Sequence, residues 1–381
     1  MTESNTTALS ENKARLERLQ SYLQSDAHNL NLLGDTALAA FETEQTELAK
    51  ELFHRYTTLA EPSDALLNMA GLIALRETNI SEAISHFTKL SIAHPASVEI
   101  TYNLAYAEGL AGMVDGALER LGKEVTSAYP PALALKMRLL HHAGRVDEAI
   151  HEGTRVAGVS EIEGLLAVLY LDKGDLSAAA IHAQAAGDQT DALTTLGMLE
   201  LESGSTEVAH TRFERLVVVH PRSGRAWLGM GLASLANQSI DDARVSLDRA
   251  ARLLERHPGS WLACGWAHLL GGFLGDARAA FEKAAHIDRN FAEAHGSLAV
   301  VAIRQGDKAA ARKLIAVATR LDERCLSAAL AQSELLREEG DVAGADQIRA
   351  AAMHAPNPVD GVSIYELLLR RGAISGGSSS N

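Results

Sequence analysis

The feature that most constrains this chain is an internal repeat of about 34 residues. Two of its three tryptophans, Trp227 and Trp261, lie 34 positions apart, and the same shift carries Gly231 onto Gly265. A period of this length indicates a stack of short supersecondary units rather than one globular core. Alanine recurs in register at ten anchor positions, 30 to 34 residues apart: Ala49, Ala83, Ala117, Ala149, Ala179, Ala209, Ala243, Ala277, Ala311 and Ala345.

Other positions repeat together with the anchors. Twelve residues before the anchor, nine of ten units have a small residue, as close contact between two helices requires. Five residues before it, seven of ten have glycine, which adopts the left-handed conformation that ends a helix. Four residues after it, seven units have Phe, Leu or Ile, one turn along the same helix face. Each unit is therefore predicted to be two helices joined by a tight turn.

All eight prolines fall 11 to 15 residues after an anchor, where a helix must stop between units. The whole pattern resembles the tetratricopeptide repeat, most clearly in TTLGMLELESGSTEVAHTRFERLVVVHP and SWLACGWAHLLGGFLGDARAAFEKAAHID. The resemblance covers about residues 30–358. It implies an all-α, right-handed α-solenoid superhelix of helix–turn–helix repeats, but no particular chemistry.

The ends of the chain follow the logic of a repeat array, whose terminal units need polar caps. We expect a disordered N-terminus over residues 1–9 and a capping helix over 10–28, with Leu16, Leu19 and Leu23 facing inward. About ten repeats follow over 29–358, then a second capping helix over 359–374 and a flexible tail over 375–381. Spacings of 30 residues in units four and five predict short second helices and a bend within residues 150–190.

Composition and motifs argue against several classes of function. A formal charge of −14 disfavours direct nucleic-acid binding and favours partners with an apolar or basic segment. The polar N-terminal segment lacks the features of a signal peptide, and no apolar run could span a membrane, so we expect a cytoplasmic protein. Neither cysteine belongs to a CxxC pair, and no Walker, HExxH, GxSxG or GxGxxG motif occurs. We therefore predict no catalytic, cofactor or metal site and no enzyme activity.

The resemblance implies that the first helix of each unit lines a concave face. The stripe at 15, 11 and 8 residues before each anchor then predicts two sets of partner-binding residues. Units six to nine offer an apolar set: Met198, Leu201, Leu228, Leu232, Leu235, Leu262, Trp266, Leu269, Val300 and Ile303. Units two to four offer a polar and aromatic set: Asn68, Tyr102, Asn103, Tyr106 and Arg138.

Each set also has a plainer interpretation. The apolar stripe is equally compatible with tight packing between repeats, and the chain's own termini or a second copy could fill it. The polar set is equally compatible with a solvated inner wall.

The function predicted from these observations is a non-catalytic scaffold or adaptor that binds a peptide or helix of a partner protein. One alternative is a peptide-responsive regulator or chaperone whose superhelix changes shape on ligand binding. A second is a self-assembling structural subunit.

Overall fold

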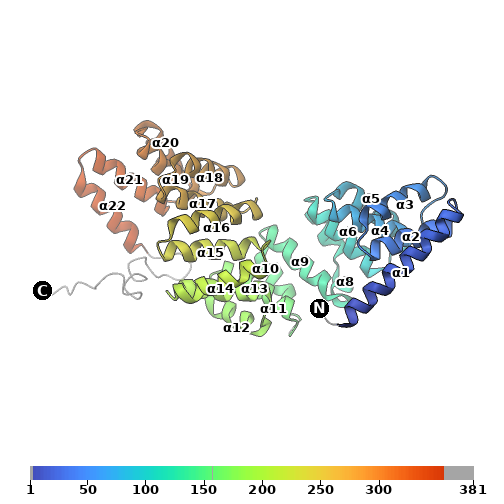
Figure 1. The fold of residues 1–381 in the computed structure, drawn as a ribbon. Helices are drawn as coiled ribbons and strands as arrows, with labels where there is room; N and C mark the ends of the chain where they lie inside the picture. Colours follow the sequence, from blue (N-terminus) through green and yellow to red (C-terminus); the bar gives the residue numbers. More distant parts are fainter. Residues whose placement is uncertain (1–2, 157, 356–381) are drawn as a thin grey trace. The chain divides into compact units, whose positions relative to one another are not determined.

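The computed structural model describes residues 3–156 and 158–355. Within these ranges the regular secondary structure consists of 22 α-helices and no strand, which confirms the predicted all-α class (Figure 1). The chain divides into an N-terminal unit, residues 1–155, and a C-terminal unit, residues 156–381. The predicted C-terminal cap over 359–374 and the tail over 375–381 lie outside the described residues.

The N-terminal unit holds one lone helix and the first four repeats. Its helices are α1 (Glu3–Ser25), α2 (Leu30–Glu42), α3 (Thr46–Thr57), α4 (Asp64–Arg76), α5 (Ile80–Ala93), α6 (Val98–Leu110), α7 (Val114–Arg120), α8 (Lys123–Ala128), α9 (Pro130–His142) and α10 (Val146–Gly153).

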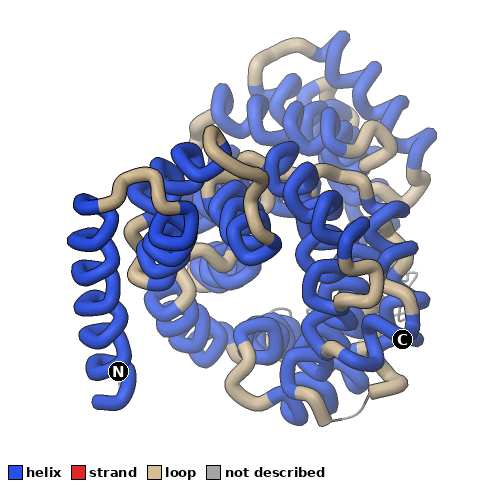
Figure 2. Tube along the Cα trace, turned by 90° about the vertical axis from the view of Figure 1, so that its right-hand side faces the viewer, coloured by secondary structure: helices blue, strands red, loops and turns tan. Residues whose placement is uncertain are grey.

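The C-terminal unit holds repeats five to ten. Figure 2 shows short loops, drawn in tan, between the blue helices of the described residues. The helices of the C-terminal unit are α11 (Ser160–Asp172), α12 (Leu176–Ala186), α13 (Thr190–Glu202), α14 (Thr206–Val219), α15 (Gly224–Ala236), α16 (Ile240–Leu253), α17 (Pro258–Leu270), α18 (Leu274–Ile287), α19 (Ala292–Arg304), α20 (Lys308–Leu321), α21 (Leu326–Glu338) and α22 (Val342–His354).

Helix α1 packs against α2, as expected of a cap, and buries Leu16 and Leu23 with the core of the first repeat. It begins at Glu3, so the prediction of disorder over residues 1–9 is wrong for residues 3–9. Residues 3–9 contain neither Gly nor Pro. Once the amphipathic segment has nucleated a helix, adding such residues to its N-terminus costs little.

The repeated small and large residues face one another inside each repeat. All ten anchor alanines are fully buried. A methyl group added to Gly71 would come within 2.7 Å of the Phe87 ring, and one added to Gly197 within 2.5 Å of the Phe213 ring. The small residue twelve before the anchor is therefore needed because the large residue four after it fills the space against its backbone.

The turn within each repeat has the same backbone conformation throughout. Seven of the ten turn positions hold glycine with φ between +74° and +90°, which confirms the predicted left-handed turns. The other three hold Glu44, Thr78 and Gln238 with φ of +60° to +61°. These residues adopt a conformation that costs a non-glycine residue free energy, so the packing of the two helices dictates the turn.

The tryptophan pair that reveals the repeat is hydrogen-bonded to the loops that join successive repeats. Trp227 Nε1 donates a hydrogen bond of 2.9 Å to the carbonyl oxygen of Pro221. Trp261 makes the same bond to the residue six positions earlier, at 3.0 Å. One further period along, His295 Nε2 lies 3.0 Å from the carbonyl oxygen six residues before it.

The second helices of repeats four and five are short, as predicted: α10 has 8 residues and α12 has 11. The shortest second helix, α7 with 7 residues, was not predicted. Gly122 adopts an extended conformation, with ψ of 172°, and separates α7 from α8. The bend within residues 150–190 stays a prediction.

Candidate functional site

The ten residues of the predicted apolar set lie on the first helices α13, α15, α17 and α19 of the C-terminal unit. Two of them, Val300 and Ile303 on α19, are only 1% and 3% exposed. They pack in one core cluster with Ala331 and Leu335 of α21. Their assignment as partner-binding residues is therefore wrong, because α21 covers them.

The cause of this burial is a close approach of α19 and α21. Gly296 of α19 has no side chain, and a methyl group there would come 2.5 Å from the backbone nitrogen of Ala328. Ser297 and Ser327 are hydrogen-bonded across the same contact at 3.1 Å. Small residues on both helices thus bring the two first helices together and close the surface between them.

The other eight residues are partly exposed and form what we call the apolar face: Met198, Leu201, Leu228, Leu232, Leu235, Leu262, Trp266 and Leu269. Most of them rest on a repeat core, as Trp266 does by contacting the Phe281 ring at a centroid distance of 5.8 Å. Packing on one side fixes these side chains, while part of each remains accessible. Whether a partner binds there stays a prediction.

In the N-terminal unit the structure brings together two members of the polar set. Asn103 Nδ2 on α6 donates a hydrogen bond of 3.4 Å to Asn68 Oδ1 on α4. Both line a pocket of about 410 Å³. At the same pocket, His94 Nε2 lies 2.6 Å from Asp64 Oδ2. Amide, carboxylate and imidazole groups on consecutive repeats could hydrogen-bond an extended peptide.

The other three polar residues do not line this pocket. Tyr102 and Tyr106 stack on one another at a centroid distance of 6.3 Å, and the Tyr102 ring meets the edge of Tyr129 at 5.3 Å. Tyr106 is 40% exposed, and Arg138 lies exposed on α9. The predicted polar set is thus divided among the pocket, a separate aromatic group and the exposed Arg138.

Sequence reasoning missed a pocket of about 540 Å³ on α14 and the start of α13. Its lining includes Leu193, Arg212, Arg215 and Val219, the last of which is 68% exposed. The available signal was the pair of apolar residues Val208 and Val219 on a second helix, which the repeat pattern places on the outer wall.

Sequence reasoning also missed a cluster of Asp248, Cys264 and His268, whose side chains meet between α16 and α17. The available signal was the spacing of Cys264 and His268, four residues apart on one helix face.

Comparison with known proteins identifies the fold. The tetratricopeptide repeat model matches residues 68–132, 194–260 and 262–323, about half of the chain. The chain belongs to the tetratricopeptide repeat family. No curated protein matches its sequence.

Two solved structures resemble the tetratricopeptide chain over most of its length. Cut9–Hcn1 of the APC/C hetero-tetramer aligns with a TM-score of 0.55 and 14% identity, over 92% of this chain and 77% of the other. A monomeric IFIT1 mutant with Gppp-AAAA aligns with a TM-score of 0.53 and 13% identity, over 85% and 90%. At this identity the likeness concerns the fold alone. Among the described helices, none combines the length and apolarity needed to cross a membrane.

Proposed function

We propose that this tetratricopeptide protein is a non-catalytic scaffold that binds a helix of a partner protein along the apolar face. The observation that carries the proposal is the recurrence of partly exposed apolar side chains on three consecutive first helices, α13, α15 and α17. An amphipathic helix could lay its apolar side chains across such a row. Because each side chain is only partly exposed, the affinity must come from several contacts together.

Three further observations support the proposal. Proteins of this family bind protein partners, and the Cut9–Hcn1 structure is itself a protein assembly. The formal charge of −14 favours a partner helix with basic flanks, since opposite charge steers association. The two buried cysteines are free thiols, as in a reducing cytoplasm, where we place the protein.

The experiment is site-specific photocrosslinking in cells with the full chain. A photoreactive residue replaces Leu232 on the apolar face, Val219 at the α14 pocket, or Val245 on the second helix α16. Val245 is 68% exposed and serves as the matched control. The proposal expects a discrete adduct from position 232 that is absent at positions 219 and 245. Adducts at 219 alone would move the site to the α14 pocket, and equal adducts at all three would refute a specific face.

A second candidate site is the Asn68–Asn103 pocket, where an extended peptide would bind through its backbone. Asn68→Ala and Asn103→Ala would then weaken a partner's binding while the Leu232 crosslink persists. The regulator and self-assembly alternatives predict different outcomes. A ligand-dependent change in radius of gyration favours the regulator, and an adduct between two copies of this chain favours self-assembly.

A further inference from the structure

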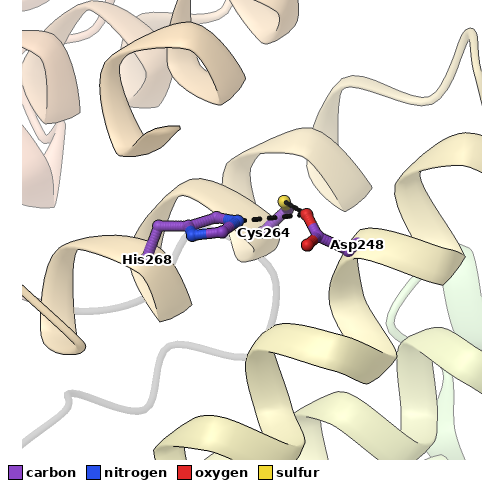
Figure 3. Close-up of side chains that lie close together, drawn as sticks. All are labelled: Asp248, Cys264 and His268. Atoms are coloured by element: carbon purple, nitrogen blue, oxygen red, sulfur yellow. Dashed lines mark hydrogen bonds and ion pairs between the residues drawn. The ribbon is translucent and has the colours of Figure 1, made fainter. Parts of the chain in front are cut away.

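Three potential metal ligands of different chemistry converge between α16 and α17 (Figure 3). Asp248 Oδ1 lies 3.2 Å from Cys264 Sγ and 3.0 Å from His268 Nε2. The three ligand atoms all lie within 4.8 Å of one another. Cys264 and His268 are 2% and 6% exposed, while the Asp248 side chain is 41% exposed and gives the cluster a route to solvent.

A second observation concerns the other nitrogen of the imidazole. His268 Nδ1 is buried and has no hydrogen-bond partner among the residues that the structure describes. Asp276 Oδ2 lies 4.0 Å from it, beyond hydrogen-bonding distance. If Nε2 donates its proton to Asp248, Nδ1 carries a lone pair, and no described group donates a hydrogen bond to it. The cluster as it stands therefore leaves one buried imidazole nitrogen unsatisfied, and such an atom calls for an explanation.

We propose that Asp248, Cys264 and His268 bind one Zn²⁺ ion, with a fourth coordination position open to solvent. One thiolate, one imidazole and one carboxylate form a ligand set typical of zinc, which binds all three in tetrahedral geometry. Softer thiolate and imidazole ligands also select zinc over Mg²⁺ or Ca²⁺. Two anionic ligands neutralise the dication, so the bound site carries no net charge in its partly buried position.

The two distances from Asp248 require only small movements. Tetrahedral ligands at zinc bond lengths stand about 3.4–3.6 Å apart. Asp248 would move outward by a few tenths of an ångström from both partners, which its exposed side chain allows. Cys264 and His268 already share one face of α17, four residues apart, and both face Asp248. Their ligand atoms lie within 4.8 Å of each other, and side-chain rotation on this one helix would bring them to the tetrahedral spacing.

The binding step balances as an exchange of one proton for the metal. The Cys264 thiol releases its proton to water, and its sulfur coordinates as thiolate. The His268 proton moves from Nε2 to Nδ1 through solvent, which frees the Nε2 lone pair for the metal. Nδ1–H then points toward Asp276, whose exposed carboxylate can rotate to accept it. Zinc-bound histidines usually donate their second N–H to such a carboxylate.

Without metal, Cys264 and His268 are each hydrogen-bonded to Asp248. Burial raises the pKa of the Cys264 thiol, so the thiol stays protonated and donates to Asp248. Burial alone would raise the pKa of Asp248 too, but the hydrogen bonds from His268 and Cys264 lower it below its ordinary value.

The test is a titration of metal-free full-length protein with Co²⁺, a spectroscopic probe for tetrahedral zinc sites, followed by displacement with Zn²⁺. The proposal expects one equivalent of Co²⁺, visible d–d bands and a thiolate charge-transfer band that Zn²⁺ removes. Cys264→Ser should abolish the charge-transfer band. Cys325→Ser, which changes the other buried thiol, is the matched control and should keep it. His268→Gln and Asp248→Asn should each weaken Co²⁺ binding at least tenfold.

The chain has 15 histidines, so metal uptake alone does not support the site. X-ray absorption of the wild-type zinc complex decides without any variant, even if Cys264→Ser fails to fold. One sulfur scatterer at about 2.3 Å beside nitrogen and oxygen scatterers supports the proposal. A wild-type protein without the charge-transfer band, a zinc shell without sulfur, or a band lost in Cys325→Ser instead of Cys264→Ser overturns it.

Discussion

Gly229→Ala should destabilise the C-terminal unit, although alanine is the better helix former. Phe213 of α14 is fully buried, and its ring lies between Gly197 of α13 and Gly229 of α15. A methyl group on Gly229 would overlap the ring. The ring has little room to retreat, because its Cζ atom overlaps that methyl position and lies 2.5 Å from where a methyl group on Gly197 would stand.

The magnitude follows from two opposing effects. Replacing glycine by alanine inside a helix gains about 1 kcal/mol of intrinsic propensity. Overpacking a well-filled core costs about 1–3 kcal/mol, and we take the upper end because the ring is confined on both sides. The net loss should be about 2 kcal/mol. With a urea m-value of about 2 kcal/mol/M, the unfolding midpoint would fall by about 1 M.

Tryptophan fluorescence during urea unfolding isolates the relevant unit, because all three tryptophans, Trp227, Trp261 and Trp266, lie in residues 156–381. Gly275→Ala in α18 is the matched control, since in the described part of the chain nothing beyond its own turn of helix lies within 4 Å of the added methyl group. It should raise the midpoint. In a Phe213→Leu background, Gly229→Ala should lose most of its cost. If Gly229→Ala stabilises the protein as Gly275→Ala does, the packing of large side chains against small residues does not stabilise the repeats.

Two further predictions concern the turn between paired helices and a buried carboxylate. Gly306 ends α19 with φ of +80°, so Gly306→Ala should cost about 1 kcal/mol, whereas Gln238→Gly should gain up to that amount at the equivalent turn; urea midpoints measure both. Burial would raise the pKa of Glu163, but hydrogen bonds from His182 and the Gly158 amide lower it below its ordinary 4.5. The stability that this carboxylate contributes is therefore present above pH 4.5 and is lost as the pH falls through its lowered pKa. In Glu163→Gln, the urea midpoint of unfolding should depend less on pH across that range than in the wild type.

The fold was predictable because each repeat contacts mainly its neighbours, so one local pattern determines every unit. Seven turn glycines identify their turns directly, while Glu44, Thr78 and Gln238 carry no such signal and follow only from the register. The break after α7 depends on the extended conformation of Gly122 within an otherwise helical segment. Local exceptions of this kind are invisible to a pattern that averages over repeats.

The candidate site was less predictable, because exposure depends on distances between helices. Position in the repeat places Leu232 and Val300 identically, yet the first is partly exposed and the second is buried. The difference arises from Gly296 and its close contact with α21, which only three-dimensional packing reveals. The metal cluster was missed for a similar reason, since Asp248 reaches Cys264 and His268 only across the junction between two repeats.

The two proposals meet in α17. One side of this helix holds Cys264 and His268 against α16. The same helix also carries Leu262, Trp266 and Leu269 of the apolar face. A zinc ion bridging α16 and α17 would fix the position of that part of the face relative to the preceding repeat. Partner binding would then lose less conformational freedom in the zinc-bound protein. By thermodynamic reciprocity, the partner helix would tighten zinc binding by the same factor, so measuring each affinity with and without the other ligand tests the coupling twice. Equal affinities in both states would show that the junction is already rigid and that the metal acts on stability alone.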